Sequence, residues 1–423
     1  MTPRATPASL VLALGVIVLG ALTSSAAAQE TSASVLNGDL PALLAHADAH
    51  SPMIASSAME TEAARLRTKS AGAWADPMVR IEPEDILNNG LELSPARVGR
   101  TRYQLMQDVP WQGKRGLRQA IAEAGTQQAS AGQERVRSDV HRAIRVAQAR
   151  WLESEERIEL VDDTAALIAD LESVARARYG TGLVPQGDVF RAQLELTRLA
   201  AERAELKGRA QATRARLNAL LGRATDAQLA LPDSLELESL PDLASALTRV
   251  ISDAPEVRNA DALQQAAQKQ RELTLRERWP DFKIGVMAMQ SGTAVDEWGL
   301  MVEFNLPLRQ ARRRAEEGER AAMLDAARLA RDDVYVRALA GLRESHAEAG
   351  AALERWSLAR ETLEPQADLT LEAALGAYRT GAMDFLSVID AALQVKQARL
   401  DSIVSAADFR RNLAEFLDYL GEA

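Results

Sequence analysis

The sequence predicts a mainly α-helical chain that is built as two similar halves and that contributes four β-strands to a β-barrel. Apolar residues make up 47% of the chain and aromatic residues only 4%, which favours long helices packed through alanine and leucine. Several landmarks occur twice in the same order, which indicates an internal repeat. Four short segments alternate between apolar and polar residues, as strands with one buried face do.

The two halves are aligned by motifs that keep a nearly constant separation. The pairs are Tyr179–Gly182 with Tyr378–Gly381, Trp74–Asp76 with Trp279–Asp281, Gln107–Pro110 with Phe304–Pro307, and Ser51–Met53 with Ala254–Glu256. One coincidence could arise by chance, but four in the same order indicate a duplication. We therefore expect a first repeat over 29–232 and a second repeat over 233–423.

The N-terminus has the features of a secretory signal peptide over 1–28. Arg4 supplies a positive charge, Leu10–Leu22 is an apolar run, and Ser24–Ala28 is a small-residue cleavage region before Gln29. The alternative is an uncleaved anchor helix, but the run is shorter than the ~20 residues of a full span. A signal peptide carries the chain beyond the inner membrane. Because no later segment is apolar enough for a spanning helix, any membrane span must use strands.

Charge and composition exclude several classes of function. The net charge of −10 argues against a nucleic-acid partner, which would require a basic surface. The chain has no cysteine, so it has no disulfide, thiolate metal site or cysteine nucleophile. It also lacks the P-loop, G-x-S-x-G and H-E-x-x-H motifs. We therefore expect no enzymatic activity and no cofactor.

Each half is expected to hold a medium helix, two strands, a very long helix and a final helix. The helices are predicted over 52–73, 113–178 and 188–222 in the first half, and over 255–278, 310–377 and 385–420 in the second. The first long helix would span roughly 100 Å at 1.5 Å per residue. Pro365 interrupts the second long helix, where we expect a kink or a local break. The final helix has coiled-coil-like apolar spacing, for which a simple helical bundle is an equally good explanation.

The strands determine the predicted class. They are expected over 77–86, 100–109, 281–290 and 298–307, joined within each pair by loops at 85–100 and 290–296. Strands of this length, apolar on one face and polar on the other, are typical of transmembrane barrels. Four strands cannot close a barrel, because the smallest known barrels need about eight. The chain would therefore supply part of a barrel shared among copies; the alternative is two half-buried hairpins in a soluble protein.

This arrangement resembles the TolC-like outer-membrane efflux family over most of the chain. The signal, the repeat, the two strand pairs and the Tyr-x-x-Gly turns occur in family order. Within the family, Asp108–Arg115 and the break at Pro365 resemble the heavy-metal branch that serves RND-type pumps. The resemblance implies a homotrimer with a twelve-stranded barrel in the outer-membrane lipid, continuous with a long periplasmic α-helical barrel. Residues 223–251 would lie at its waist.

The resemblance also implies a passive conduit. Cargo would come from an inner-membrane RND-type pump through a periplasmic adaptor, the membrane fusion protein. Two alternatives stay open: a periplasmic coiled-coil adaptor or scaffold, and an outer-membrane duct for type I protein secretion. The alternation at 298–306 argues against the scaffold.

The family pattern places a constriction on the last helix. Asp390 matches a constriction position, and three copies would put three carboxylates around one axis, where they attract cations. The family often has a second acid three residues earlier, but this sequence has Ser387 there. The ring would therefore be weaker or single. The alternative for Asp390 is an ordinary solvated helix-face aspartate.

The same pattern implies a bond that holds the gate shut. Asp188 matches a position that bonds the tyrosine of the other turn, here Tyr378. The alternatives are a helix N-cap for Asp188 and a helix-end packing residue for Tyr378. Gly182 and Gly381 are expected to permit the two turns and to let adaptor tips approach.

Two metal-site hypotheses remain. One face of the predicted strands carries Met78, Met106, Met287, Met289 and Met301, and thioethers favour Cu(I) and Ag(I); the alternative is that methionine acts as a flexible filler. His46 and His50 are spaced i,i+4 on a short helix with Asp48 between them, but no third ligand is evident. No resident metal is therefore expected.

Overall fold

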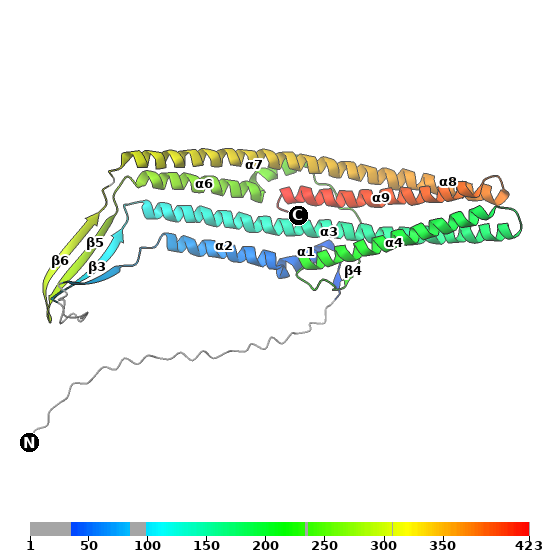
Figure 1. Cartoon of the computed structure of the whole chain (residues 1–423). Helices are drawn as coiled ribbons and strands as arrows, with labels where there is room; N and C mark the ends of the chain where they lie inside the picture. The colour runs from blue at the N-terminus through cyan, green and yellow to red at the C-terminus, as the bar shows by residue number, and fades with distance from the viewer. Residues whose placement is uncertain (1–34, 85–98, 233–235, 307, 423) are drawn as a thin grey trace, which may run out of the picture. The chain divides into compact units, whose positions relative to one another are not determined.

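The computed structural model describes residues 35–84, 99–232, 236–306 and 308–422 (Figure 1). The predicted signal peptide and most of the predicted loop at 85–100 lie outside the described residues. Val35–Ala423 forms one compact unit. Nowhere in the described ranges does a helix combine the length and the apolar character needed to cross a membrane.

The mainly helical prediction is confirmed. The helices are α1 (Leu40–His50), α2 (Pro52–Ala71), α3 (Lys114–Gly180), α4 (Gln186–Leu220), α5 (Leu243–Asp253), α6 (Pro255–Arg276), α7 (Gln310–Leu358), α8 (Glu364–Thr380) and α9 (Phe385–Tyr419). Pro52 and Pro255 open α2 and α6, where the missing N–H costs no helical hydrogen bond. The sequence did not predict α5, which begins at the N-cap Asp242 inside a segment that otherwise holds prolines.

The helices lie side by side in roughly parallel rows, here called lanes (Figure 1). The longest helix, α3, packs against α2 and α4 on one side and against α6 and α9 on the other. The pair α6 and α9 packs in turn against α7, and α8 packs against α9. A buried cluster that includes Ile168, Phe385 and Val388 joins α3, α4, α8 and α9. Burying each such side chain contributes about 1.5–3 kcal/mol, so packing and not helix propensity holds these lanes together.

The second long helix is not uniform. The sequence predicted a kink or break near Pro365, and the structure has a five-residue π-helical turn, Ala359–Leu363, between α7 and α8. Proline has no N–H to donate to the carbonyl four residues earlier, and its ring crowds that carbonyl. The wider π turn places this proline in the first turn of α8, where the missing donor is harmless.

Four antiparallel strands form one sheet at the far end of the helices (Figure 1). They are β2 (Met78–Glu84), β3 (Arg100–Val109), β5 (Phe282–Ser291) and β6 (Ala294–Phe304), in the order β2-β3-β5-β6. A separate two-stranded parallel ladder pairs β1 (Leu36–Asn37) with β4 (Leu229–Ala230). The predicted loop at 290–296 is wrong, because β5 and β6 meet in a tight turn at Gly292. The φ of 64° at this glycine suits a short hairpin.

Gly341 on α7 makes room for the aromatic ring of Tyr419. A Cβ at position 341 would collide with the Cζ and hydroxyl oxygen of Tyr419. The substitution Gly341→Ala is therefore expected to lower the free energy of unfolding by about 1–3 kcal/mol, measured by thermal unfolding of the helical circular-dichroism signal. Gly132→Ala on α3 is the control, because open space surrounds its Cβ position. We expect it to raise stability by up to ~1 kcal/mol; equal effects of both variants would contradict the close contact.

Candidate functional site

The helical hairpins α3–α4 and α8–α9 end in turns of the same construction. Gly182 has a φ of 75° and Gly381 a φ of 79°, in the left-handed region that glycine adopts without strain. In the first turn Leu183 N–H donates to the carbonyl oxygen of Arg178 at 3.0 Å, and in the second Ala382 N–H donates to that of Ala377 at 2.9 Å. This is the glycine-dependent helix ending in which the first residue past the glycine bonds back across the last turn.

Arg178 joins the two turns. Its guanidinium lies 4.5 Å from the centroid of the Tyr378 ring. It also donates to the carbonyl oxygens of Tyr378 at 3.0 Å and of Arg379 at 3.2 Å. These carbonyls belong to the last turn of α8, where the partial negative charge of the helix end favours a cation. Arg178 is not among the site residues predicted from the sequence, although a basic residue directly before Tyr179 is a visible signal.

The predicted bond between Asp188 and Tyr378 is not formed in this structure. The Tyr378 side chain is 3% exposed and its ring packs against Phe385, with centroids 5.7 Å apart. Among the described residues its hydroxyl has no hydrogen-bond partner. The ring lies in a buried cluster beneath the Arg178 guanidinium, so its hydroxyl is shielded from solvent.

Asp188 lies in the first turn of α4 and is not its N-cap, because that position is Pro185. Partial burial raises the pKa of Asp188, nearby Arg191 opposes the shift, and the Asp384 carboxylate adds to it. Asp188 therefore interacts electrostatically with the other turn through Asp384 and not through the tyrosine.

The start of α9 is fixed by its own cap. The Asp384 side chain accepts a hydrogen bond from the Ser387 N–H at 2.9 Å. Hydrogen bonds from the Ser387 side chain and backbone hold the pKa of Asp384 below its usual value. Ser387 is thus engaged within its own helix end. Asp390 is exposed, one turn further along α9 and next to the buried Ile389; its role at a constriction stays a prediction.

The strand register brings the five methionines named above to one sheet face. Met78 pairs with Met106, and Met106 pairs across β5 with Gly285, whose partner on β6 is Met301. Met287 pairs with Gly299 and Met289 with Glu297. Because side chains alternate along a strand, these positions all project to the same side.

The strands are anchored to the helices by a polar junction in the segment Asp108–Arg115. The side chain of Lys114 is 3% exposed, and its Nζ donates to Asp281 Oδ1 and to the carbonyl oxygen of Trp279, both at 2.8 Å. The Trp111 N–H donates to the same carboxylate oxygen at 2.8 Å, and the Trp111 and Trp279 rings stack with centroids 5.1 Å apart. One carboxylate thus joins both halves of the chain.

The structure does not join Asp48 to the two histidines that flank it in the sequence. The His46 and His50 rings stack with centroids 4.2 Å apart. Asp48 instead bonds Arg137 at 2.8 Å and His141 at 2.9 Å. Burial alone would raise the pKa of Asp48, but these hydrogen bonds lower it. Across the described ranges, no three or more His, Asp or Glu side chains are placed to hold a metal ion.

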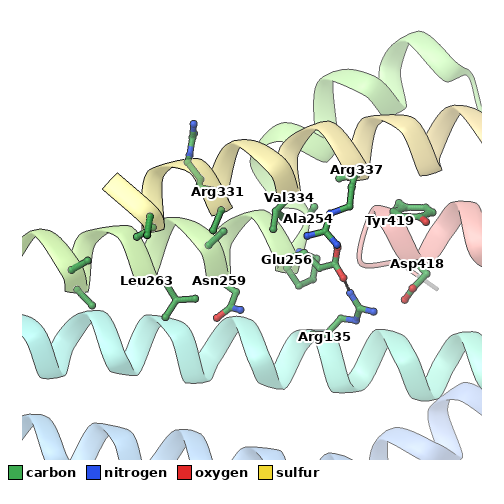
Figure 2. A pocket seen from close by; sticks show the side chains of 18 of the residues that line it. Arg135, Ala254, Glu256, Asn259, Leu263, Arg331, Val334, Arg337, Asp418 and Tyr419 are labelled. Carbon is green, nitrogen blue, oxygen red and sulfur yellow. Dashed lines mark ion pairs between the residues drawn. The ribbon is translucent and has the colours of Figure 1, made fainter. Parts of the chain in front are cut away.

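A cavity of about 1000 Å³ lies among α3, α6, α7 and α9 (Figure 2). Apolar side chains such as Leu263 and Val334 form much of its wall. Its arginines are already paired with carboxylates: Arg135 with Glu256, Arg142 with Glu415, Arg331 with Asp261, and Arg337 with Asp333. Every arginine among the described lining residues is therefore paired with a carboxylate, so none is left to bind an anion.

The chain is similar to known proteins both in sequence and in fold. The family model described as outer membrane efflux protein matches residues 246–422. The nickel-cobalt-cadmium resistance protein NccC of Alcaligenes xylosoxydans xylosoxydans is 29% identical over 238 residues, which are 56% of this chain and 53% of NccC. The match thus spans about half the length of that relative.

Solved structures share the fold over most of its length. The outer-membrane channel OprN has a TM-score of 0.79 and 17% identity, covering 91% of this chain and 90% of OprN. The outer membrane protein VceC from Vibrio cholerae has a TM-score of 0.78 and 19% identity, covering 91% of this chain and 96% of VceC. CusC has a TM-score of 0.78 and 15% identity, covering 92% and 93% of the two chains. The chain is therefore similar to outer membrane efflux proteins in the sequence of its second half, and it shares their fold over most of its length.

Proposed function

We propose that the chain is the outer-membrane channel component of a tripartite efflux system, a passive conduit without enzymatic activity. The observation that carries the proposal is the exposed apolar face of the four-stranded sheet. Trp298 is 77% exposed, Leu300 75% and Val79 66%. Apolar side chains so exposed on one sheet face, with charged side chains on the other, suit strands that face lipid outward and water inward.

The functional unit would be a homotrimer. In the described sheet β2 and β6 are each paired on one side only, so each edge offers free backbone groups to another copy. Three copies of four strands would close a barrel of twelve, within the range known for outer-membrane barrels. The outermost helical lanes also expose apolar residues that identical copies could cover: Met53, Met59 and Leu66 on α2, Phe190 and Leu194 on α4, and Met323, Leu329 and Val336 on α7.

The order of elements supports an internal two-fold repeat. The series α2, β2, β3, α3, α4 is followed by α6, β5, β6, α7 with α8, and α9. Two such halves would give the helical barrel six near-equivalent hairpins per trimer. We place the barrel in the outer membrane and the helices in the periplasm, with the α3–α4 and α8–α9 turns toward the inner membrane.

The gate would lie at these turns, where Asp390, Ser387, Tyr378 and Asp188 gather on two hairpins. Gly182 and Gly381 would let the tips of a periplasmic adaptor approach the backbone. An RND-type pump would supply cargo and energy. The similarity to NccC, a nickel-cobalt-cadmium resistance protein, favours metal ions as the cargo over proteins or drugs.

Single-channel conductance in planar bilayers tests this function. The purified wild-type protein is expected to give long-lived ion-conducting openings. The substitution Asp390→Ala should enlarge them and weaken block by divalent cations about tenfold, because three carboxylates around one axis concentrate cations there.

The control is Asp401→Ala, an exposed aspartate further along the same helix, which should conduct like the wild type. Openings that Asp390→Ala leaves unchanged would keep the conduit and remove Asp390 from its constriction. Absence of insertion and conductance would overturn the conduit in favour of a periplasmic scaffold.

A further inference from the structure

Five of the ten methionines of the chain gather on the polar face of the sheet. Their neighbours on this face are charged or polar: Arg80, Glu82, Arg102, Gln104, Lys283 and Glu303. Methionine as a flexible filler belongs in apolar surroundings. Here the five methionines lie among charged side chains, while the apolar residues lie on the opposite face. A filler role does not explain this placement.

Two glycines create space beside three of these methionines. Gly285 lies between Met106 and Met301 across the strands, and a Cβ at this glycine would lie 3.0 Å from Cγ of Met106. A Cβ at Gly299 would lie 2.7 Å from Cε and 3.5 Å from the thioether sulfur of Met287. The side chain of Met287 therefore lies over Gly299, and that of Met106 leans toward Gly285. Since neighbouring strands are about 5 Å apart, the three flexible side chains can reach one another.

The middle of this face is less exposed than the apolar face opposite it. Met106 and Met289 are each 6% exposed, whereas Leu105 is 46% and Val286 47% exposed on the opposite face. Met287 and Met301 are half-buried, so a dissolved ion can reach their side chains.

Gln104 is a second, independent sign of a ligand. It pairs with Met287 in the register, so both project from the same face. Gln104 is 8% exposed, and among the described residues its side-chain carbonyl oxygen has no hydrogen-bond partner. A buried acceptor without a donor is costly unless an ion or water satisfies it. A cation beside Met287 would do so.

We propose that Met106, Met287 and Met301 form a site for a soft monovalent cation, Cu(I) or Ag(I), with Gln104 beside it. Thioether sulfur selects such ions, while carboxylates and imidazoles suit harder ones. The nearby charges are already compensated, with Arg102 bonded to Glu84 at 2.6 Å and Lys283 near Glu303 at 3.7 Å. Binding rests on the sheet of one chain alone; a role for the site along an export path rests on the proposed function.

Silver ions themselves are the probe. Isothermal titration of Ag(I) into the purified full-length protein should show one saturable site per chain. The triple substitution Met106→Leu, Met287→Leu and Met301→Leu keeps apolar volume and should raise the dissociation constant at least about tenfold. The matched control replaces Met53, Met59 and Met323 with leucine; these are 57%, 68% and 55% exposed and lie on helices. The control should bind Ag(I) like the wild type.

Equal Ag(I) binding by wild type and triple variant would overturn the site, as would an equal loss in the control. If the triple variant does not fold, Met287→Leu alone should weaken binding and Gln104→Leu should weaken it less; unchanged affinity in Met287→Leu would also overturn the site. Zn(II) should bind the wild type and the triple variant equally, and a thioether-dependent Zn(II) site would contradict the selectivity. Conductance separates the two proposals: channels with no Ag(I) site discard only the site, and an Ag(I) site without channels discards only the conduit.

Discussion

The substitution Asp281→Ala is expected to lower the free energy of unfolding by about 2–3 kcal/mol. It would remove the counter-ion of Lys114, whose side chain is only 3% exposed, and leave a buried ammonium group. It would also remove the acceptor for the Trp111 N–H. This loss is smaller than the ~3–5 kcal/mol typical of a fully buried pair, because the Asp281 side chain is 41% exposed. Thermal unfolding of the purified protein in detergent, followed by circular dichroism, measures the change.

Two variants control this result. Asp332→Ala removes a carboxylate that is 67% exposed and paired with Arg331, and should change stability by less than ~0.5 kcal/mol. The double variant Lys114→Met with Asp281→Ala should recover part of the loss, because it leaves no unpaired buried charge. If the double variant is as unstable as the sum of its single changes, the two side chains do not act as a pair.

The same pair gives a pH dependence with a definite sign. Burial alone would raise the pKa of Asp281, but the hydrogen bonds from Lys114 and the Trp111 N–H outweigh it and lower the pKa. A carboxyl with a lowered pKa in the folded state stabilises the fold above its unfolded-state value. That contribution is lost as the pH falls below about 4 and through the folded-state pKa. The stability difference between wild type and Asp281→Ala should therefore shrink in this acid range and stay constant near neutrality.

The substitution Arg178→Ala is expected to raise the open probability of the proposed channel about tenfold or more. The guanidinium bonds two carbonyls at the end of α8 and lies over the Tyr378 ring, so it holds the two hairpins together. Charge-assisted hydrogen bonds contribute about 1.5–3 kcal/mol, and each 1.4 kcal/mol changes a two-state ratio tenfold. Single-channel recording at fixed voltage measures the open fraction.

Arg176→Ala is the matched control for this prediction. Arg176 lies one half-turn earlier on α3, is 66% exposed and pairs only locally with Glu172. It should leave the open probability unchanged. Arg178→Lys keeps the charge without the planar fork and should give an intermediate value. If Arg176→Ala opens the channel as much as Arg178→Ala does, the effect comes from general loss of charge at the tip and not from the contact with Tyr378.

The sequence gives local structure more reliably than long-range contacts. The predicted helix at 113–178 is close to α3 (Lys114–Gly180), because sixty or more residues without proline leave little alternative to a helix. The strand at 100–109 has the observed bounds of β3, because alternation sets its faces. The sequence predicts a loop at 290–296 because the residues around Gly292 are polar, whereas in the structure most of these residues continue the two strands.

The candidate site was harder to predict because its partners come from distant segments. The resemblance supplied Asp188 and Tyr378, but the partner that the structure gives to Tyr378 is Arg178, 200 residues away in the chain. Periodicity cannot identify such a pair. The methionine face was accessible from alternation alone, whereas its grouping around Gly285 and Gly299 required the register of three strands.

Because of the π turn at Ala359–Leu363, the α7–α8 helix bends more easily than α3 does. The α3 lane runs without interruption from the sheet to the tip, while the α7 lane changes its hydrogen-bond pattern on the way. Such defects are where helices bend. The 17 residues of α8 form a lever about 25 Å long, so a bend of about 10° moves its far end by roughly 4 Å. The α8–α9 hairpin can therefore bend at the π turn, while the α3–α4 hairpin keeps its position.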